Sequence, residues 1–215
     1  MGENNYLLGS RVFRKIREDI LSGRYAADEE LREKTIGDEM GVSRTPVREA
    51  LRQLELEGLV SIIPNKGAYV VGITQKDVRD IYEIRSRLEG LCARWAAESI
   101  TKEQLGELEE IIDLSEFYSG KERYEQVVEL DNRFHGVLYH ASGSKELRRV
   151  LLDFHCYVQR VRRITLSEPK RVADSNEEHS KILEALKLHD AELAETLAHE
   201  HVRNTMENMD NSGLF

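Results

Sequence analysis

The 215-residue sequence has little of what marks several classes of protein. Its two cysteines, Cys92 and Cys156, are too few for a disulfide framework or a cysteine-based zinc site, and both lie in apolar helical stretches. We therefore expect buried, reduced thiols. No stretch approaches the roughly 20 consecutive apolar residues that a membrane span requires, and no secretory signal is recognisable. These absences lead us to expect a cytoplasmic protein that does not cross a membrane.

A net positive charge is also lacking. The formal net charge is −9 at pH 7, which for the chain as a whole weighs against a nucleic-acid binder. Residues 1–72, however, hold 11 Lys and Arg against 12 Asp and Glu, so most of the negative charge lies in residues 73–215. Binding to DNA would therefore depend on a local basic patch in the N-terminal part.

The first third of the chain shows the pattern of three helices followed by a β-hairpin. Apolar spacing, glycines at helix ends and a proline in one first turn predict helices at residues 10–22, at 33–40 and within 42–59, where Gly58 ends the third. A short turn that contains glycine between two short helices is typical of a helix-turn-helix. Residues 59–72 form two β-branched runs around Pro-Asn-Lys-Gly, which predicts a hairpin. This order predicts a winged helix-turn-helix over residues 8–73.

Arg44 and Arg48 are the candidate base-reading residues. They lie four residues apart at the start of the third predicted helix, so both project from one side, opposite its apolar face. Arginine pairs bidentately with guanine in the major groove, where the N-terminal end of a recognition helix lies. The other candidate DNA contacts bind phosphates or form the tip of the wing: Lys34, Ser43, Thr45, Lys66 and Gly67. The same spacing also fits a solvated amphipathic helix beside an incidental hairpin.

The motif around these arginines is more specific than their spacing. The run VSRTPVREAL at residues 42–51, followed by Leu54, by Glu-Gly-Leu at 57–59 and by Pro64-x-x-Gly67, resembles the winged-helix domain of the GntR family of bacterial regulators. The resemblance covers roughly residues 10–72. It implies a homodimer that binds double-stranded operator DNA of two-fold symmetry, and a ligand that changes this binding.

Two residues depart from the family pattern. Gly37 stands where the family usually has alanine, which weakens the second helix slightly because glycine is a poor helix former. Lys34 stands where arginine is frequent, and lysine preserves a phosphate contact better than a bidentate base contact. Neither change is expected to abolish the fold.

From Thr74 onward the pattern is helical throughout. Helices are predicted at residues 75–99, 102–117, 121–141, 144–166, 175–188 and 190–210. The short turns between them predict an antiparallel bundle. The predicted fold class is therefore mainly α, with a winged helix-turn-helix of three helices and a β-hairpin, followed by an all-α antiparallel bundle over residues 74–212.

Four side chains of the types that bind metals fall on the apolar faces of three predicted helices. At about 100° per residue, Asp131 and His135 lie in the middle of one such face, and His179 and His201 lie inward on the last two helices. Burying these groups without partners would cost several kcal/mol, whereas one divalent ion satisfies all four. Nitrogen and carboxylate donors suit zinc or nickel. The pattern also resembles the metal site of FCD-type domains in the FadR branch of the GntR family, over residues 78–205.

Arg85 and Arg162 are the candidate ligand-binding residues. Arg85 lies on the apolar face of its helix, where a guanidinium needs an anion, and it can clamp a ligand carboxylate or form a structural ion pair with Glu89. Arg162 lies at the rim of an apolar face and is the weaker candidate. Together with the resemblance, these residues predict a transcription regulator, in the commoner case a repressor. We expect a small carboxylate, bound at the metal site, to control its operator affinity.

Two other functions remain compatible with the same residues. An Asp/His metal site with an open position can activate water, as in metal-dependent hydrolases. Against this, no inward-facing glutamate is evident as a general base beside the four ligands, and we expect no enzymatic activity. Alternatively, the helical domain serves only for dimerisation, with its polar core residues satisfying one another.

Overall fold

The computed structural model describes the backbone of residues 2–211 and the side chains of residues 8–155, 157–159, 161–163 and 165–209. The side chain of Cys156 lies outside these described residues. Contacts within the chain divide it into two compact units, Met1–Thr74 and Gln75–Phe215. Each unit is described by itself.

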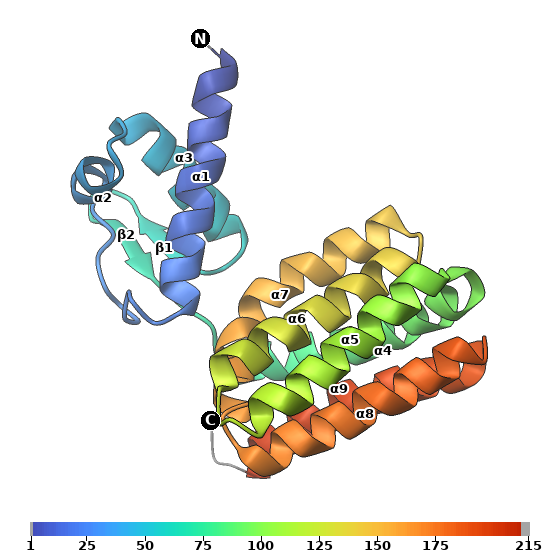
Figure 1. Ribbon diagram of the computed structural model, residues 1–215. Helices are drawn as coiled ribbons and strands as arrows, with labels where there is room; N and C mark the ends of the chain where they lie inside the picture. Colours follow the sequence, from blue (N-terminus) through green and yellow to red (C-terminus); the bar gives the residue numbers. More distant parts are fainter. Residues whose placement is uncertain (1, 212–215) are drawn as a thin grey trace. The chain divides into compact units, whose positions relative to one another are not determined.

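The N-terminal unit is the predicted winged helix-turn-helix (Figure 1). Its elements are α1 (Gly2–Leu21), α2 (Glu33–Met40), α3 (Arg44–Leu56), β1 (Val60–Ile63) and β2 (Gly67–Val70). The two strands pair antiparallel, with Val60 opposite Val70 and Ile63 opposite Gly67. The third helix ends before the hairpin at the predicted glycine, since Gly58 adopts a left-handed φ of 75°.

The core of this unit joins all of its elements. Apolar side chains from the three helices and both strands are buried together: Val12, Ile16, Ile20, Ile36, Val47, Leu51, Leu54, Val60, Ala68 and Val70. Gly37 has a specific place in this packing, since a Cβ on it would lie 2.9 Å from the backbone oxygen of Val42. The glycine therefore allows the turn between α2 and α3 to pack closely against α2.

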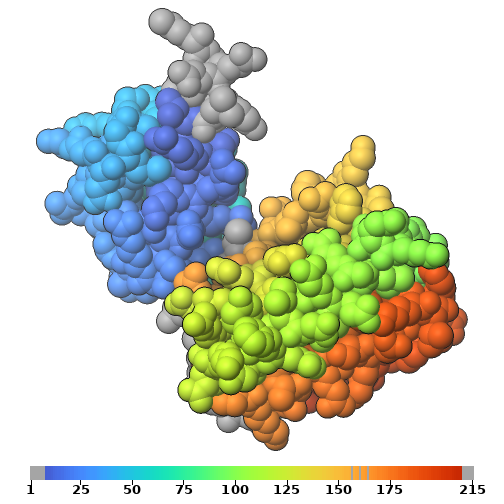
Figure 2. Space-filling model, in the orientation of Figure 1, coloured from blue at the N-terminus to red at the C-terminus, as the bar shows by residue number. Residues whose placement is uncertain are grey.

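The C-terminal unit is an all-α domain, as predicted (Figure 1). Its helices are α4 (Gln75–Ser99), α5 (Lys102–Ser119), α6 (Tyr124–Ala141), α7 (Lys145–Thr165), α8 (Pro169–Lys187) and α9 (Ala191–Asn211). Figure 2 shows the surface of this unit, with α5 (green) beside α8 (orange). Among the residues that the structure describes, no helix combines the length and apolar character needed to cross a bilayer.

Local signals explain most of these boundaries. Thr101, where the run Thr-Lys-Glu-Gln predicts an N-terminal cap, forms a capping box with Gln104, which starts α5. Two predicted starts were wrong. Helix α6 begins at Tyr124, not at 121, because Glu122 has a left-handed φ of 56°. Helix α8 begins at Pro169, six residues before its predicted start, with the proline in its first turn, where its missing N–H costs no hydrogen bond.

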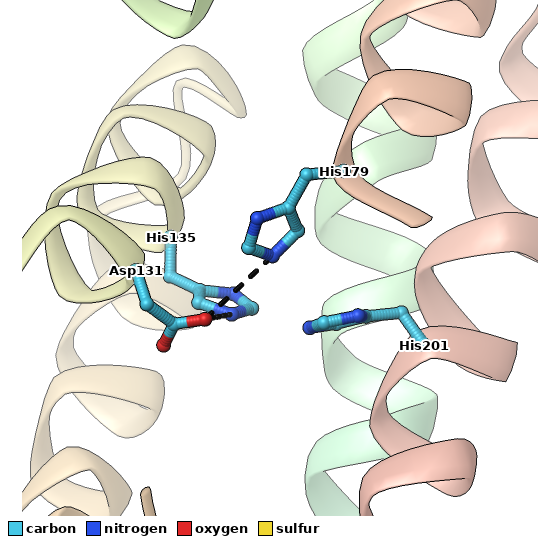
Figure 3. Close-up of side chains that lie close together, drawn as sticks. All are labelled: Asp131, His135, His179 and His201. Atoms are coloured by element: carbon cyan, nitrogen blue, oxygen red, sulfur yellow. Dashed lines mark ion pairs between the residues drawn. The ribbon is translucent and has the colours of Figure 1, made fainter. Parts of the chain in front are cut away.

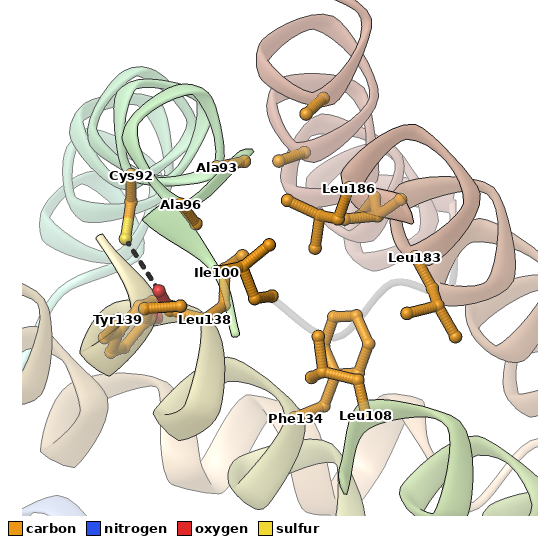
Figure 4. Packing of buried hydrophobic residues seen from close by; sticks show 14 of the residues in the cluster. Cys92, Ala93, Ala96, Ile100, Leu108, Phe134, Leu138, Tyr139, Leu183 and Leu186 are labelled. Carbon is orange, nitrogen blue, oxygen red and sulfur yellow. Dashed lines mark hydrogen bonds between the residues drawn. The ribbon is translucent and has the colours of Figure 1, made fainter. Parts of the chain in front are cut away.

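The apolar core of the helical unit lies beside the polar site described below. Figure 4 shows Cys92, Phe134, Leu138 and Leu186 packed with alanines of α4. Cys92 is a free, buried cysteine whose thiol donates to the carbonyl of Leu138 at 3.5 Å. Burial raises the pKa of this thiol to about 12. Cys92 is therefore the inert, reduced thiol expected from the sequence.

Candidate metal centre and nucleic-acid interface

The four predicted metal ligands lie together inside the helical unit. One ligand atom from each of Asp131, His135, His179 and His201 lies within 4.8 Å of the others, and all four residues are buried. Figure 3 shows the convergence: α6 supplies Asp131 and His135 one turn apart, while α8 and α9 supply one histidine each. Residues up to 70 positions apart in the sequence thus form one donor set.

The donor set has room for an ion rather than a closed hydrogen-bond network. Nε2 of His135 and Nε2 of His179 lie 3.9 and 3.8 Å from Oδ1 of Asp131, too far for hydrogen bonds. Nε2 of His179 is buried and has no hydrogen-bond partner. An orphaned buried nitrogen beside a carboxylate and two more imidazoles is what a nitrogen-binding and oxygen-binding divalent cation would satisfy. The residues therefore fit the metal that the pattern predicts.

Two carboxylates hold the outer nitrogens of the histidines. Oε2 of Glu89 lies 2.7 Å from Nδ1 of His135, and Oε2 of Glu178 lies 2.7 Å from Nδ1 of His201. A proton on Nδ1 leaves Nε2 as the acceptor, which is the form that binds a metal. Tyr139 donates its hydroxyl to Oε1 of Glu89 at 2.7 Å and so helps to hold that carboxylate.

The expectation that no inward-facing glutamate lies beside the ligands was wrong. Glu89 is only 1% exposed. A signal for it was present, because Glu89 lies one turn after Arg85 on the buried face of α4, a spacing that favours an ion pair. Glu178 gave no comparable signal, since it is adjacent to His179 in sequence and its partner His201 lies on another helix.

The surroundings of Asp131, His135 and His179 keep these donors in the protonation states that bind a cation. Burial lowers the pKa of His135 and that of His179, helped by Arg162 in the first case and His201 in the second. Both imidazoles are therefore neutral at neutral pH, as ligation requires. Burial opposes ionisation of Asp131, but Arg162 and the imidazoles outweigh it and lower the pKa of this carboxyl.

The outer carboxylates are also ionised. Burial works against the charge of Glu178, yet hydrogen bonds from His201 and Arg171 lower its pKa to about 2. Burial likewise opposes ionisation of Glu89, and Arg85 and His135 outweigh it, so that its pKa is well below the usual value. Each carboxylate that contacts the histidine cluster thus carries a full negative charge at neutral pH.

The arginines lie closer to the cluster than the sequence indicated. Arg85 forms the ion pair with Glu89 that was one of its two expected roles. Arg162 was expected at a rim but is buried, with Nε 3.0 Å from Oδ2 of Asp131 and a hydrogen bond to Asn132. Arg171, which the sequence analysis missed, is also buried. A cavity of about 20 Å³ is lined by side chains that include Tyr82, Arg85, Asp131, His135, Arg162, Arg171 and His201.

In the winged unit, four of the predicted DNA contacts border one cleft. They come from both helices of the helix-turn-helix and from the wing: Lys34, Arg44, Arg48 and Gly67. Ser43, Thr45 and Lys66 are exposed but do not border this cleft. Ser43 precedes α3 without capping it, so no cap bond occupies its hydroxyl. Gly67 has a φ of 124°, a conformation that side chains rarely adopt.

Two features of this cleft were missing from the sequence analysis. Arg48 donates from Nε and from a terminal nitrogen to the two carboxylate oxygens of Glu33, both at 2.7 Å. The pair is bidentate, so it presents the guanidinium in the geometry that also matches guanine. Arg52 borders the cleft as well and extends the stripe of Arg44 and Arg48 by one turn. The spacing of four residues was its signal.

Comparisons with known proteins agree with this architecture. Residues 8–70 match the model of the gntR family of bacterial regulatory proteins, and residues 80–204 match the FCD domain. The chain is 28% identical to the HTH-type transcriptional repressor RspR of Escherichia coli, over 94% of this chain and 89% of that protein. It is 31% identical to a probable D-xylose utilization operon transcriptional repressor of Paenarthrobacter nicotinovorans, over 91% and 85%.

A solved structure shares the fold. Escherichia coli McbR/YncC superposes with a TM-score of 0.75 at 23% identity, over 95% of this chain and 98% of that one. The relatives named above and YdhC of Bacillus subtilis, 29% identical over 92% of both chains, are named as transcriptional regulators or repressors. The chain therefore belongs to the GntR family of bacterial transcriptional regulators, with a gntR-type helix-turn-helix followed by an FCD domain.

Proposed function

We propose that this regulator is a repressor that binds a two-fold symmetric operator as a homodimer and responds to a small organic acid at a divalent metal site. The observation that carries the proposal is the convergence of Asp131, His135, His179 and His201 in one buried cluster, with Nε2 of His179 unpartnered. Zinc or nickel suits this donor set. When bound, such an ion supplies a Lewis-acidic centre for an oxygen of the effector.

The chain's own residues would hold the metal and orient the effector. Asp131 and the three histidines hold the ion, and Glu89 and Glu178 keep two of the imidazoles in the required orientation. Arg85 and Arg162 border the same cavity and carry the positive charge that attracts a carboxylate.

On the DNA, Arg44 and Arg48 would read bases from the major groove. Lys34, Ser43, Thr45 and the wing residues Lys66 and Gly67 would bind the backbone. The pair between Arg48 and Glu33 is exposed to solvent, so its exchange for a guanine contact costs little. Repression is supported by relatives that are named as repressors.

Effector and operator binding must be linked through differential affinity. The effector can release the DNA only if it binds better to an arrangement of the dimer that fits the operator poorly. The cavity of about 20 Å³ holds little more than one water molecule. Admitting an organic acid therefore requires side chains to move, which supplies a difference between the two states.

The test is elemental analysis of the purified full-length protein together with operator retention in a gel-shift assay. We expect about one zinc or nickel ion per chain, and loss of the ion in His179→Ala. The matched control is His140→Ala, because His140 is exposed on the same helix as His135 and should leave the metal content unchanged. Failure of the wild-type protein to retain stoichiometric metal at neutral pH would remove the sensor part of the proposal.

The two alternative functions receive less support. Glu89, which lies beside the cluster, is committed to Arg85, His135 and Tyr139, and its lowered pKa makes it a weak general base at neutral pH. A purely dimerising domain would leave the orphaned nitrogen of His179 unexplained. It also predicts that a chelator does not change the melting temperature.

A further inference from the structure

Three arginines surround the cavity beside the candidate metal ligands. Arg85, Arg162 and Arg171 come from α4, α7 and α8, all border the cavity, and are 2%, 4% and 3% exposed. A guanidinium stays protonated under all conditions that a protein meets. Three permanent positive charges in one buried site need compensation.

Each of these arginines has one carboxylate partner. The three ion pairs are Arg85–Glu89, Arg162–Asp131 and Arg171–Glu178. The third is bidentate, with distances of 3.2 and 2.9 Å from the two terminal nitrogens of the arginine to the two carboxylate oxygens. Among the described residues of this site, three positive charges therefore face three negative ones, and the site is balanced before any ion binds.

A divalent cation would disturb this balance. The imidazoles of His135, His179 and His201 ligate in their neutral form, and the charge of Asp131 is already matched by Arg162. The ion would therefore leave two uncompensated positive charges in a buried site, where an unmatched charge is costly. A monoanionic ligand would cancel one of them and a dianionic ligand both.

Hydrogen-bond donors for an anionic ligand are present. Nε of Arg85, Nε of Arg171 and the hydroxyl of Tyr82 are buried without a hydrogen-bond partner. Arg171 also donates to the hydroxyl of Thr205 at 3.0 Å, so it joins α8 to α9 at the edge of the cavity. Buried donors without partners favour a ligand that brings acceptor oxygens.

We propose that the effector is a small dianion, with one anionic group on the metal beside Arg85 and Arg162 and the second on Arg171. This inference rests on the proposed function and narrows the class of effector. The second group would compete with Glu178 for Arg171, and Glu178 also holds His201. Effector binding at Arg171 would thus change the contact between Glu178 of α8 and His201 of α9.

The experiment measures binding to the zinc-loaded full-length protein by calorimetry, with probes that differ in charge. L-malate and L-lactate are both 2-hydroxy acids and differ by one carboxylate. We expect L-malate to bind at least about 10-fold more tightly than L-lactate, and to bind only when zinc is present.

Variants of Arg171 separate charge from folding. Arg171→Gln should weaken malate binding by about 10-fold or more while changing lactate binding by less than about 3-fold. Arg171→Lys keeps the charge and should keep the preference. Melting curves of both variants without ligand show whether they fold.

Three results would overturn the inference: lactate binding as tightly as malate, equal loss of malate and lactate binding in Arg171→Gln, or no binding of malate. Zinc content and operator retention, measured on the same preparation, distinguish these results from failure of the proposed function. If zinc and operator both bind and malate is not preferred, only the effector class is wrong. If zinc does not bind, both proposals fall.

Discussion

Each of the two units of this regulator contains an ion pair between an arginine and a glutamate, exposed in one unit and buried in the other. In the winged unit, Arg48 pairs with Glu33 at the surface, with side chains 56% and 29% exposed. In the helical unit, Arg85 pairs with Glu89 in the interior, with side chains 3% and 1% exposed. Surface pairs contribute about 0 to 1 kcal/mol and exchange partners easily, whereas breaking a buried pair costs about 3 to 5 kcal/mol. Burial thus decides whether an arginine can exchange its partner, as the proposed DNA contact of Arg48 requires, or holds a site together.

The largest effect should come from breaking the buried pair. Arg85→Met leaves Glu89 buried without its arginine partner, and we expect the free energy of unfolding to fall by about 3 to 5 kcal/mol in urea titrations. Arg48→Met, the matched change at the surface, should lower it by less than about 1 kcal/mol. Similar losses in the two variants would refute the contrast between the units.

Removal of the metal should affect only the helical unit. For an ion present at 100 to 1,000 times its dissociation constant, chelation should destabilise that unit by about 3 to 4 kcal/mol. Hydrogen exchange on the full chain can locate the effect, with protection lost in residues 75–211 and kept in residues 8–70. Uniform loss over both units would contradict a local metal site, and His179→Ala should mimic chelation.

Changes in the winged unit should act on DNA binding and leave stability alone. Arg44→Ala should weaken binding to the specific operator by about 1 to 3 kcal/mol per half-site, because it removes a bidentate base contact. Lys66→Ala should mainly reduce the salt dependence of binding, since it removes a phosphate contact. If Arg44→Ala weakens binding to random DNA equally, then Arg44 does not read bases.

The metal-free helical unit should also lose stability in acid. The folded-state pKa values of His135 and His179 are lowered, and that of His155 is about 4, with burial as the main cause. As pH falls below about 6.5, these histidines take up protons in the unfolded chain before they do so in the folded chain. The free energy of unfolding therefore decreases until the pH reaches the folded-state pKa values. The slope is at most about 1.4 kcal/mol per pH unit for each imidazole. Urea titrations between pH 7 and pH 5 measure it.

Much of the fold and the donor set followed from the sequence because their signals are local. Turn glycines, the cap at Thr101 and apolar periodicity marked the elements, and the same periodicity placed Asp131, His135, His179 and His201 on inward faces. Side chains that face inward from neighbouring helices of a bundle have little room to lie far from one another. The start of α8 was missed because its first turn has no side-chain cap.

The partners of the charged residues could not be predicted in the same way. Glu178 and Arg171 are seven residues apart on α8, and only the position of α9 shows that Glu178 also holds His201. Arg162 reaches Asp131 because α6 and α7 pack together. A helix face can be calculated from one segment, but a contact depends on the rotation and offset of two segments.

The sequence by itself determined which segments are helices, where the wing turns and which side chains must avoid water, because these depend on neighbours within a few residues. Only the tertiary structure decided that three arginines and three carboxylates pair one to one around a single cavity. The reason is physical: the energy of a buried charge depends on every group that surrounds it, and those groups come from helices far apart in the chain.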